Sequence, residues 1–336
     1  MVGCVIVSPD GAVVGAAYHA RAGDPHAEVL ALRQAGVRAR GATLYCSLEP
    51  CAHAGRTGPC AVAVADAGVA RVVAAVEDPD PRVSGRGLAY LRARGVDVRV
   101  GVCAREAAAL NRAFFTAVTR GRPFVTIKVA TSLDARVAAV GGRRTAITSG
   151  PANDDVHALR AEVDAIAVGV GTVLADDPLL TARGVGRTRP LLRVVFDARL
   201  RTPVRARLFA TLASGPVVVV TSEDGLAAAP ARAEALRGAG AELVALPPRA
   251  LGAALAALGS RAVRWLLIEG GPTLHAAAWR AGVVDHVRVY VAPLVLGPAG
   301  VAWAMPPGFS TAGLDEHHAE PFGPDVRIDG YVHRTH

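Results

Sequence analysis

The sequence predicts two α/β domains, and three observations support that fold class. Apolar, β-branched stretches alternate with helix-like stretches along most of the chain, which is typical of layered α/β structure. The alternation pauses at Arg120–Pro123 and then restarts. The length of 336 residues also exceeds what a single hydrophobic core usually supports. We therefore expect one domain over residues 1–119 and a second over residues 123–336.

The first domain is expected to open with a β-hairpin. Apolar stretches over residues 2–7 and 12–18 flank the turn signal Pro9-Asp10-Gly11. Pro25 then predicts the start of a helix that ends at Gly36. Further strands are expected over 43–47, 69–76 and 96–100, with helices over 59–67 and 87–94 and one connecting helix over 106–119.

The second domain repeats the same alternation. Its predicted strands cover residues 124–130, 165–170, 192–196, 217–221, 263–268 and 286–291. Its predicted helices cover residues 155–163, 231–236 and 273–281. The stretch 171–183 and the Pro-rich stretches near 247 and 306 are expected to be loops. This pattern favours a second layered sheet.

Composition narrows the class of partner. The formal net charge of +8 comes almost entirely from scattered arginines, and aromatic residues make up only 4% of the chain, so we expect no nucleic-acid partner. An anionic small substrate suits the arginines equally well. We expect no membrane span, because no run of eighteen apolar residues occurs. Five cysteines and no signal-peptide pattern indicate a reducing, cytoplasmic location.

Three residues have the chemistry of a catalytic zinc site. His26 precedes a predicted helix, Cys51 follows a predicted strand, and Cys60 begins the next helix. One imidazole and two thiolates leave the fourth tetrahedral position for water, whose pKa zinc lowers toward about 7. Glu28, two residues after the histidine, is placed to carry the proton from that water to a leaving amine. Base deaminases have this H-x-E and P-C signature.

The spacing of the two cysteines departs from the usual deaminase motif. P-C-x-x-C is common, but eight residues separate Cys51 from Cys60. Two alternatives therefore stay open on the motif alone. The residues are either unrelated buried cysteines beside a helix-start histidine, or a structural zinc site with His53 as the fourth ligand.

The longer spacing resembles that of one family. The segments Gly23–Glu28 and Glu49–Cys60 closely resemble the zinc loop of the bifunctional riboflavin-biosynthesis deaminase/reductase family. The resemblance implies a cytidine-deaminase-like α/β/α domain that acts on 2,5-diamino-6-ribosylamino-4(3H)-pyrimidinone 5′-phosphate. It also implies that His53 and Arg56 border the substrate. Ala54 and Gly58 depart from the family's usual residues.

Three segments of the second domain resemble the reductase half of the same family. They are Lys128–Asp134, Gly171–Arg183 and Ile268–Leu274, the last with a glycine pair before a helix start that suits phosphate binding. The resemblance implies a dihydrofolate-reductase-like α/β fold that uses NADPH. The cofactor residues it implies are Ala130, Ala146, Thr172, Asp176, Ala198, Gly271, Pro272, Thr273, Leu274, His275, Ala276 and Ala277. The substrate residues it implies are Arg144, Arg160, Leu180, Arg183 and Glu269.

The implied second reaction moves a hydride from NADPH to C1′ of the ribosyl group and opens it to a ribityl chain. Lys128 is the only lysine in an arginine-rich chain, which favours a task that needs an ammonium able to lose its proton. We expect Lys128, with Asp134 nearby, to polarise or protonate the sugar.

Three alanines depart from the reductase pattern. Ala146, expected in a strand, replaces tryptophan, and Ala198 replaces serine, both at the cofactor site. Ala135 replaces glycine, which is tolerable only if its φ is negative.

The family also carries a helix and a Pro-Asn-Pro turn ahead of the segment that matches Val2–Cys4, and the asparagine contacts the pyrimidine. Because the sequence begins at Met1, we expect both to be missing and the natural start to lie upstream. A helix that hid on the order of 400 Å² of apolar surface would stabilise the domain by up to about 10 kcal/mol.

The bifunctional enzyme is therefore the favoured hypothesis, with homodimerisation expected from the family. A reductase with an inactive, truncated deaminase domain is the first alternative. A deaminase of nucleic-acid bases needs an aromatic-lined basic channel that the sequence does not predict. A non-catalytic, zinc-stabilised binding protein would hold zinc without an exchangeable water and would not bind NADPH.

Overall fold

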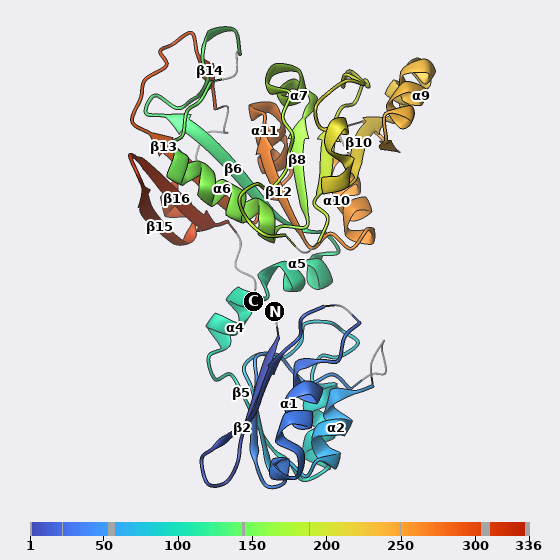
Figure 1. Cartoon of the computed structure of the whole chain (residues 1–336), viewed down its shortest axis with the longest axis vertical. Helices are drawn as coiled ribbons and strands as arrows, with labels where there is room; N and C mark the ends of the chain where they lie inside the picture. Colours follow the sequence, from blue (N-terminus) through green and yellow to red (C-terminus); the bar gives the residue numbers. More distant parts are fainter. Residues whose placement is uncertain are drawn as a thin grey trace. The chain divides into compact units, whose positions relative to one another are not determined.

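The chain forms two compact units, one that ends at Arg120 and one that begins at Gly121 (Figure 1). The computed structural model describes residues 2–21, 23–52, 58–142, 145–187, 189–248, 250–303 and 310–332. Within these ranges, none of the helices has the length and apolar character needed to cross a membrane. Each unit is built around its own sheet and is described separately.

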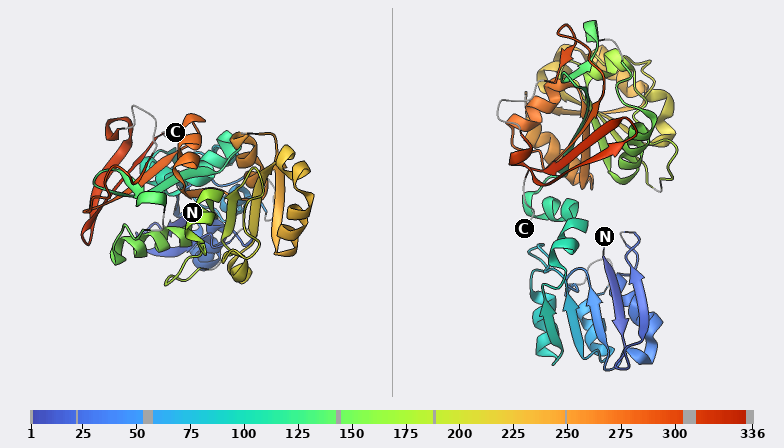
Figure 2. Two further views of the ribbon diagram at one scale, coloured as in Figure 1. Left: turned by 90° about the horizontal axis from the view of Figure 1, so that it is seen from above. Right: turned by 90° about the vertical axis from the view of Figure 1, so that its left-hand side faces the viewer.

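The first unit has a five-stranded sheet with the order β2-β1-β3-β4-β5 (Figure 2). The predicted hairpin is present, with β1 antiparallel to both β2 and β3, whereas β3, β4 and β5 run parallel. The strands are β1 (Gly3–Val7), β2 (Val13–Tyr18), β3 (Thr43–Cys46), β4 (Arg71–Ala74) and β5 (Asp97–Val100). The helices are α1 (Ala27–Ala35), α2 (Cys60–Asp66), α3 (Arg86–Ala93), α4 (Ala104–Leu110) and α5 (Arg112–Arg120), with a 3₁₀ turn over Gly36–Ala39.

One face of this sheet is fully packed and the other is partly open. Side chains of β1, β3 and β4 form a core with the alanines of α1 and the buried residues of α2 and α3. On the opposite face, Val5 and Tyr45 stay exposed beside a hollow of 590 Å³ that is also lined by α4. Whether an upstream helix covers this face stays a prediction.

The second unit has a nine-stranded sheet with the order β11-β10-β9-β8-β12-β6-β13-β16-β15. The strands from β11 to β13 run parallel, and β16 and β15 add antiparallel pairs at one edge. The strands are β6 (Phe124–Ser132), β8 (Ala165–Gly169), β9 (Leu192–Phe196), β10 (Val217–Ser222), β11 (Ala241–Leu246), β12 (Trp265–Gly270), β13 (His286–Ala292), β15 (Asp315–Phe322) and β16 (Asp325–Tyr331). A separate ribbon pairs β7 (Arg136–Ala138) with β14 (Val301–Ala302).

Helices bury this sheet on both faces. The helices are α6 (Gly150–Glu162), α7 (Val170–Asp176), α8 (Glu223–Ala228), α9 (Pro230–Gly238), α10 (Leu251–Ser260) and α11 (Pro272–Arg280), with 3₁₀ turns over Val140–Gly142, Phe209–Ser214 and Thr311–Gly313. Residues of α10 and α11 pack on one face, and residues of α6 and α9 pack on the other. Figure 1 shows α6 lying across β6 and β13. Parallel strands covered on both faces explain the continuous apolar runs of the sequence.

Several sequence predictions were wrong in their local detail. The stretch 171–183 is not all loop, because α7 occupies its first half. The connecting helix is two helices, α4 and α5, separated at Asn111. Ala146 lies in an irregular segment, not in a strand. Ala135 has a φ of 55°, so alanine does adopt the left-handed conformation that we expected to exclude it.

Three of the elements that the sequence analysis missed lack the expected periodicity. Helix α10 is rich in alanine, leucine and glycine and has little amphipathic pattern, and β11 was not recognised as a strand. Strand β15 consists mainly of exposed polar residues and is held by its backbone pairing with β16. Hydrophobic alternation does not identify such an edge strand.

Candidate functional site

His26, Cys51 and Cys60 come together in the first unit as the sequence predicts. One ligand atom from each residue lies within 4.8 Å of the others. The His26 Nδ1 atom is 3.1 Å from the Cys60 sulfur and 3.5 Å from the Cys51 sulfur. Ligand atoms around a tetrahedral zinc ion lie roughly 3.5 Å apart, given the usual zinc–nitrogen and zinc–sulfur bond lengths. The donor set and its spacing therefore fit a zinc ion.

The ligands are positioned by the starts of two helices. His26 is the N-cap of α1, and Cys60 is the first residue of α2. The backbone N–H of Cys60 donates to the Cys51 sulfur at 3.4 Å, which ties the two ends of the intervening loop together. Helix starts also favour negative charge on the thiolates.

A buried carboxylate supports the strand end that carries Cys51. Glu49 is 3% exposed and accepts hydrogen bonds from the backbone N–H groups of Gly85, Gly87 and Leu88 at the start of α3. A Cβ atom added at Gly87 would lie 1.8 Å from the carbonyl oxygen of Pro50. Close packing of α3 on Glu49 and Pro50 therefore fixes the backbone next to the metal ligand.

The Cys60 thiol donates a hydrogen bond to the Cys51 sulfur. The pKa of Cys51 is lowered to about 5, chiefly because the Cys60 thiol donates to its sulfur, while burial opposes the shift. The pKa of Cys60 is raised because its thiol is the donor of that hydrogen bond and is buried. A divalent cation between the sulfurs would replace this proton.

Glu28 lies beside the three ligands with one oxygen available. Its side chain is 3% exposed, and its Oε2 atom has no hydrogen-bond partner within the part of the chain that the structure describes. Burial raises the pKa of its carboxyl to about 7. An unsatisfied buried oxygen is costly unless a ligand or water completes it. Glu28 therefore fits the proton-transfer role that the motif predicts.

Lys128, Arg160 and Glu269 meet in the second unit from β6, α6 and β12. Arg160 donates to both Glu269 oxygens, from Nε at 2.6 Å and from Nη at 2.5 Å, and to the carbonyl of Thr181 at 3.1 Å. Burial lowers the pKa of Lys128, the Glu269 carboxylate opposes this shift, and Arg160 adds to it. Lys128 is thus a half-buried amine next to an ion pair that is already complete.

Asp134 is held by hydrogen bonds of its own. Its carboxylate accepts hydrogen bonds from Ser132 Oγ at 2.5 Å and from the backbone N–H groups of Leu296 and Gly297. These bonds anchor the turn that contains Ala135 to the loop after β13. Glu269 and Arg160, and not Asp134, are the charged groups that shift the pKa of Lys128.

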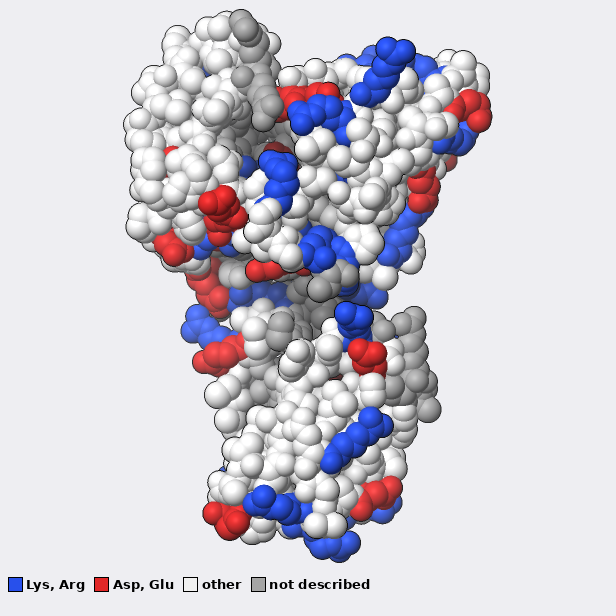
Figure 3. Space-filling view, in the orientation of Figure 1, with Lys and Arg blue, Asp and Glu red and all other residues white. Residues whose placement is uncertain are grey.

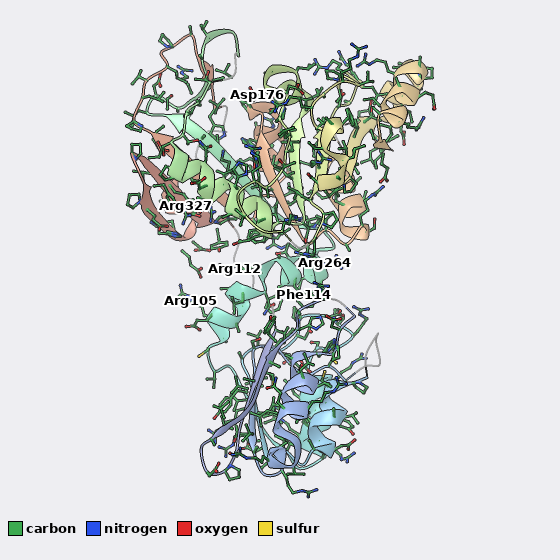
Figure 4. The ribbon with its side chains drawn as sticks, viewed as in Figure 1. Arg105, Arg112, Phe114, Asp176, Arg264 and Arg327 are labelled. Atoms are coloured by element: carbon green, nitrogen blue, oxygen red, sulfur yellow. The ribbon has the colours of Figure 1, made fainter. Side chains whose placement is uncertain are left out.

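The expected cofactor residues lie near the ends of neighbouring parallel strands. Gly271 is the N-cap of α11, and a Cβ atom added there would lie 3.3 Å from Thr172 Oγ1 in α7. Ala130 lies near the end of β6, and the Ala198 carbonyl after β9 accepts a hydrogen bond from Ser222. Figure 4 shows Asp176 at the end of α7. Such strand ends are the usual ligand-binding edge of an open parallel sheet.

The helix after the glycine pair turns one of its expected residues inward. His275 is 2% exposed, and its Nε2–H donates to the carbonyl of Ile268 at 3.2 Å. Burial lowers its pKa to about 4, so the ring is neutral at pH 7. Its side chain therefore packs in the interior, whereas Pro272 and Thr273 stay at the helix start.

The remaining expected substrate residues differ in exposure. Leu180 is buried with a φ of 54°, and Arg183 is exposed and donates its backbone N–H to His157 Nδ1. His53, Arg56 and Arg144 fall outside the residues that the structure describes. On the face shown in Figure 3, basic side chains are interspersed with acidic ones and form no continuous basic stripe.

Two residues near these groups were not found from the sequence. His157 in α6 contacts the Arg183 backbone, and Tyr290 in β13 lies beside Lys128, with the Lys128 Nζ atom 5.5 Å from the ring centroid. No motif marks either residue. A tyrosine within a strand of alternating valines was the one available signal, because a buried hydroxyl needs a partner.

Comparison with known proteins assigns both units. The family model of the RibD C-terminal domain matches residues 123–328, and that of the cytidine and deoxycytidylate deaminase zinc-binding region matches residues 1–76. The riboflavin biosynthesis protein RibD of Aquifex aeolicus is 41% identical over 296 residues, which cover 88% of this chain and 81% of that protein. The protein of the same name from Escherichia coli is 42% identical over 302 residues, 88% of this chain and 82% of that one.

Solved structures agree with these matches. Acinetobacter baumannii RibD, form 1, has a TM-score of 0.85 and 37% identity, covering 99% of this chain and 92% of that one. A diaminohydroxyphosphoribosylaminopyrimidine deaminase/5-amino-6-(5-phosphoribosylamino)uracil reductase from Thermotoga maritima has a TM-score of 0.83 and 30% identity, covering 98% and 91%.

The metal site gives a direct prediction. We expect Cys60→Ser to lower zinc affinity by more than about 100-fold, because loss of a ligand should cost more than the 10- to 100-fold typical of an outer-shell residue. Bound zinc is measured by competition with a chelating dye. Cys103→Ser is the matched control, since Cys103 is exposed and lies outside the ligand cluster. Equal zinc affinity in both variants would contradict the assignment.

His275 predicts an acid-sensitive second unit. Its pKa of about 4 in the folded chain lies below the ordinary 6.5, so between these pH values the unfolded chain binds a proton that the folded chain does not. Stability should therefore fall as pH drops from 6.5 to 4, by about 2 kcal/mol at pH 5 relative to His275→Gln.

This prediction can be checked without interference from the first unit. All three tryptophans lie in the second unit, at positions 265, 279 and 303, so urea unfolding followed by fluorescence reports on that unit alone. His317→Gln, at an exposed position, serves as the control. The same pH dependence in wild type and His275→Gln would show that the buried ring is not responsible.

Proposed function

Since the chain belongs to the RibD family of riboflavin-biosynthesis enzymes, we propose that its two sites act in turn on one phosphorylated pyrimidine. The chain is a bifunctional enzyme with a zinc-binding deaminase domain and a reductase domain. The first site hydrolyses the amine of 2,5-diamino-6-ribosylamino-4(3H)-pyrimidinone 5′-phosphate. The second reduces the ribosyl group, giving 5-amino-6-ribitylaminouracil 5′-phosphate.

The buried, unpartnered Glu28 oxygen beside His26, Cys51 and Cys60 is the observation that carries the deaminase assignment. Zinc bound by those three residues supplies Lewis-acid activation of a water. Glu28 accepts the proton of the attacking water and passes it to the departing amine, which leaves as ammonia. A carboxyl with a pKa raised to about 7 suits both transfers near neutral pH.

Lys128 is the group best placed to assist the reduction. Thr172 and Gly271 would hold the cofactor, which we propose to be NADPH and which would supply a hydride to C1′ of the ribosyl group. The Lys128 ammonium would donate a proton to the ring oxygen as the bond from that oxygen to C1′ breaks. Burial lowers the pKa of Lys128 and so favours release of the proton. Asp134 shapes the adjacent turn in this proposal.

The charged residues around Lys128 form the rest of the substrate site in this proposal. Arg160 and Glu269 form a fixed pair beside the amine, and Arg183 is exposed nearby for the ribosyl phosphate. We place His53, Arg56 and Arg144 at the substrate on family resemblance. We further propose a homodimer on family resemblance, and a reducing, cytoplasmic setting because the two cysteine ligands must stay unoxidised to bind zinc.

Glu28→Gln should separate the two activities. The amide keeps the size of the side chain but cannot carry the proton, so we expect normal zinc content and a 10²- to 10⁴-fold lower rate of ammonia release, on the order expected for loss of general acid–base catalysis. The isolated deaminated intermediate should still be reduced at the wild-type rate. Undiminished ammonia release would refute the role of Glu28.

Lys128→Met should give the opposite result. Deamination should persist while oxidation of NADPH slows by roughly 10²- to 10⁴-fold, because the proton donor is missing. Mass spectrometry of the products distinguishes the cases, since the variant should accumulate the deaminated but unreduced ribosylamino compound. Lys128→Arg is the matched variant that retains charge, and we expect it to be slow as well. Full reductase rate in Lys128→Met would eliminate this assignment.

A further inference from the structure

Tyr290 occupies an unusual position for a tyrosine in a core strand. Its side chain is fully buried, and it lies on β13 in register with Ala130 of β6. The Lys128 Nζ atom lies 5.5 Å from the centroid of the Tyr290 ring. An ammonium within about 6 Å of an aromatic face is attracted by the negative potential of that face.

The ring of Tyr290 is held from behind by a set of charged groups. Its hydroxyl donates to Asp155 on α6, and burial raises its pKa, so the hydroxyl stays protonated. Asp155 also accepts a hydrogen bond from Arg327 at 2.8 Å, and Arg288 lies 3.6 Å away. Asp329 in turn accepts from Arg288 and Arg327, each at 2.9 Å.

These contacts join three elements around one ring. Asp155 lies on α6, Arg288 on β13, and Arg327 and Asp329 on β16; Figure 4 labels Arg327 on its strand near α6. Arg327 also lies over the ring of Phe322, which packs against Tyr290 with its centroid 6.4 Å away. With the hydroxyl bound and the edge packed, the orientation of the Tyr290 ring is fixed.

The charged neighbours of Lys128 act on its ammonium in opposite directions. Glu269 attracts the ammonium although both of its oxygens are bonded to Arg160, Arg160 repels it, and His275 on α11 is neutral. Within the described part of the chain, no hydrogen bond from Nζ is formed. The aromatic face therefore adds to the attraction of Glu269 a contact that occupies none of the protons of the amine.

We propose that Tyr290 is a positioning residue for the reductase site, whose ring holds and stabilises the ammonium of Lys128 while leaving its N–H groups free for the substrate. The inference rests on the proposed role of Lys128. Asp155, Arg288 and Arg327 act through Tyr290 by fixing the ring. An ammonium on an aromatic face keeps its positive charge, and all of its N–H groups can still donate hydrogen bonds. A carboxylate partner would accept one of those N–H groups and would also make the ammonium harder to deprotonate.

The single lysine makes this proposal testable without an assay of activity. Protein grown with lysine labelled with ¹³C at Cε gives one side-chain resonance, that of Lys128, and its pH titration reports the pKa of that amine. We expect Tyr290→Phe, which keeps the aromatic face but loses the hydrogen bond to Asp155, to titrate closer to the wild type than Tyr290→Leu does. Tyr290→Leu, which removes the face, should titrate at lower pH. Identical titrations in all three proteins would overturn the proposal.

A second series keeps the test decisive if Tyr290→Leu fails to fold. Phenylalanines with one, two and three ring fluorines at position 290 weaken the negative face step by step with little change in shape. The pKa of Lys128 should fall further with each added fluorine. A pKa that stays the same across the series would contradict the proposal. A role in packing alone predicts no such trend.

Kinetics then separate this inference from the proposed function. If Lys128 is the proton donor, the alkaline limb of the pH profile of reductase kcat should shift together with the pKa of Lys128. In the most fluorinated protein kcat should fall by about 2- to 30-fold, the range expected for a lost cation–π contact. Deamination should not change. A shifted titration with an unchanged reductase profile would retain the contact between Tyr290 and Lys128 but refute the catalytic role of Lys128.

Discussion

Both sites depend on a carboxylate that the fold removes from water, and the two carboxylates are treated in opposite ways. Glu28 is buried with one oxygen unsatisfied among the described residues, so burial raises its pKa to about 7 and it can accept and release a proton. Glu269 is bonded at both oxygens by Arg160, which lowers its pKa although burial opposes this. The first carboxylate is therefore reactive, and the second is a fixed charge that shapes its surroundings.

Parallel strands explain why such groups converge. In the second unit Glu269, Ala130 and Gly271 lie at or near the carboxyl ends of β12 and β6, and Thr172 follows the end of β8. In the first unit Cys51 follows β3, and the two other ligands are at helix starts. Because each strand end leads into a loop or a helix start, side chains and free N–H groups gather at one edge of each sheet.

The sequence was most informative where chemistry is local. His26, Glu28, Cys51 and Cys60 lie in two short segments, so the motif together with the family resemblance predicted a cluster, and the ligand atoms of its three metal-binding residues lie within 4.8 Å of one another. The two domains and most of their strands followed from apolar runs and helix-start signals. Sequence was least informative where tertiary context decides, as at Ala135, where a turn anchored by Asp134 imposes a positive φ, and at β15, a polar strand held by backbone pairing. Tyr290 was missed because its contacts come from α6, β6 and β15, which are distant in the sequence.

Arginine and lysine have different chemical properties in the second site. The chain uses arginine for fixed pairing, and Arg160 does this with a planar fork that matches both oxygens of Glu269. Such a group cannot give up its proton near neutral pH. Lys128 carries the same charge on a compact amine whose pKa burial lowers, and it lies against an aromatic ring that takes none of its protons. If arginine replaced it, the charge would persist but a proton that can be released near neutral pH would not, which fits the role that we propose for the one lysine among the 37 lysines and arginines of the chain.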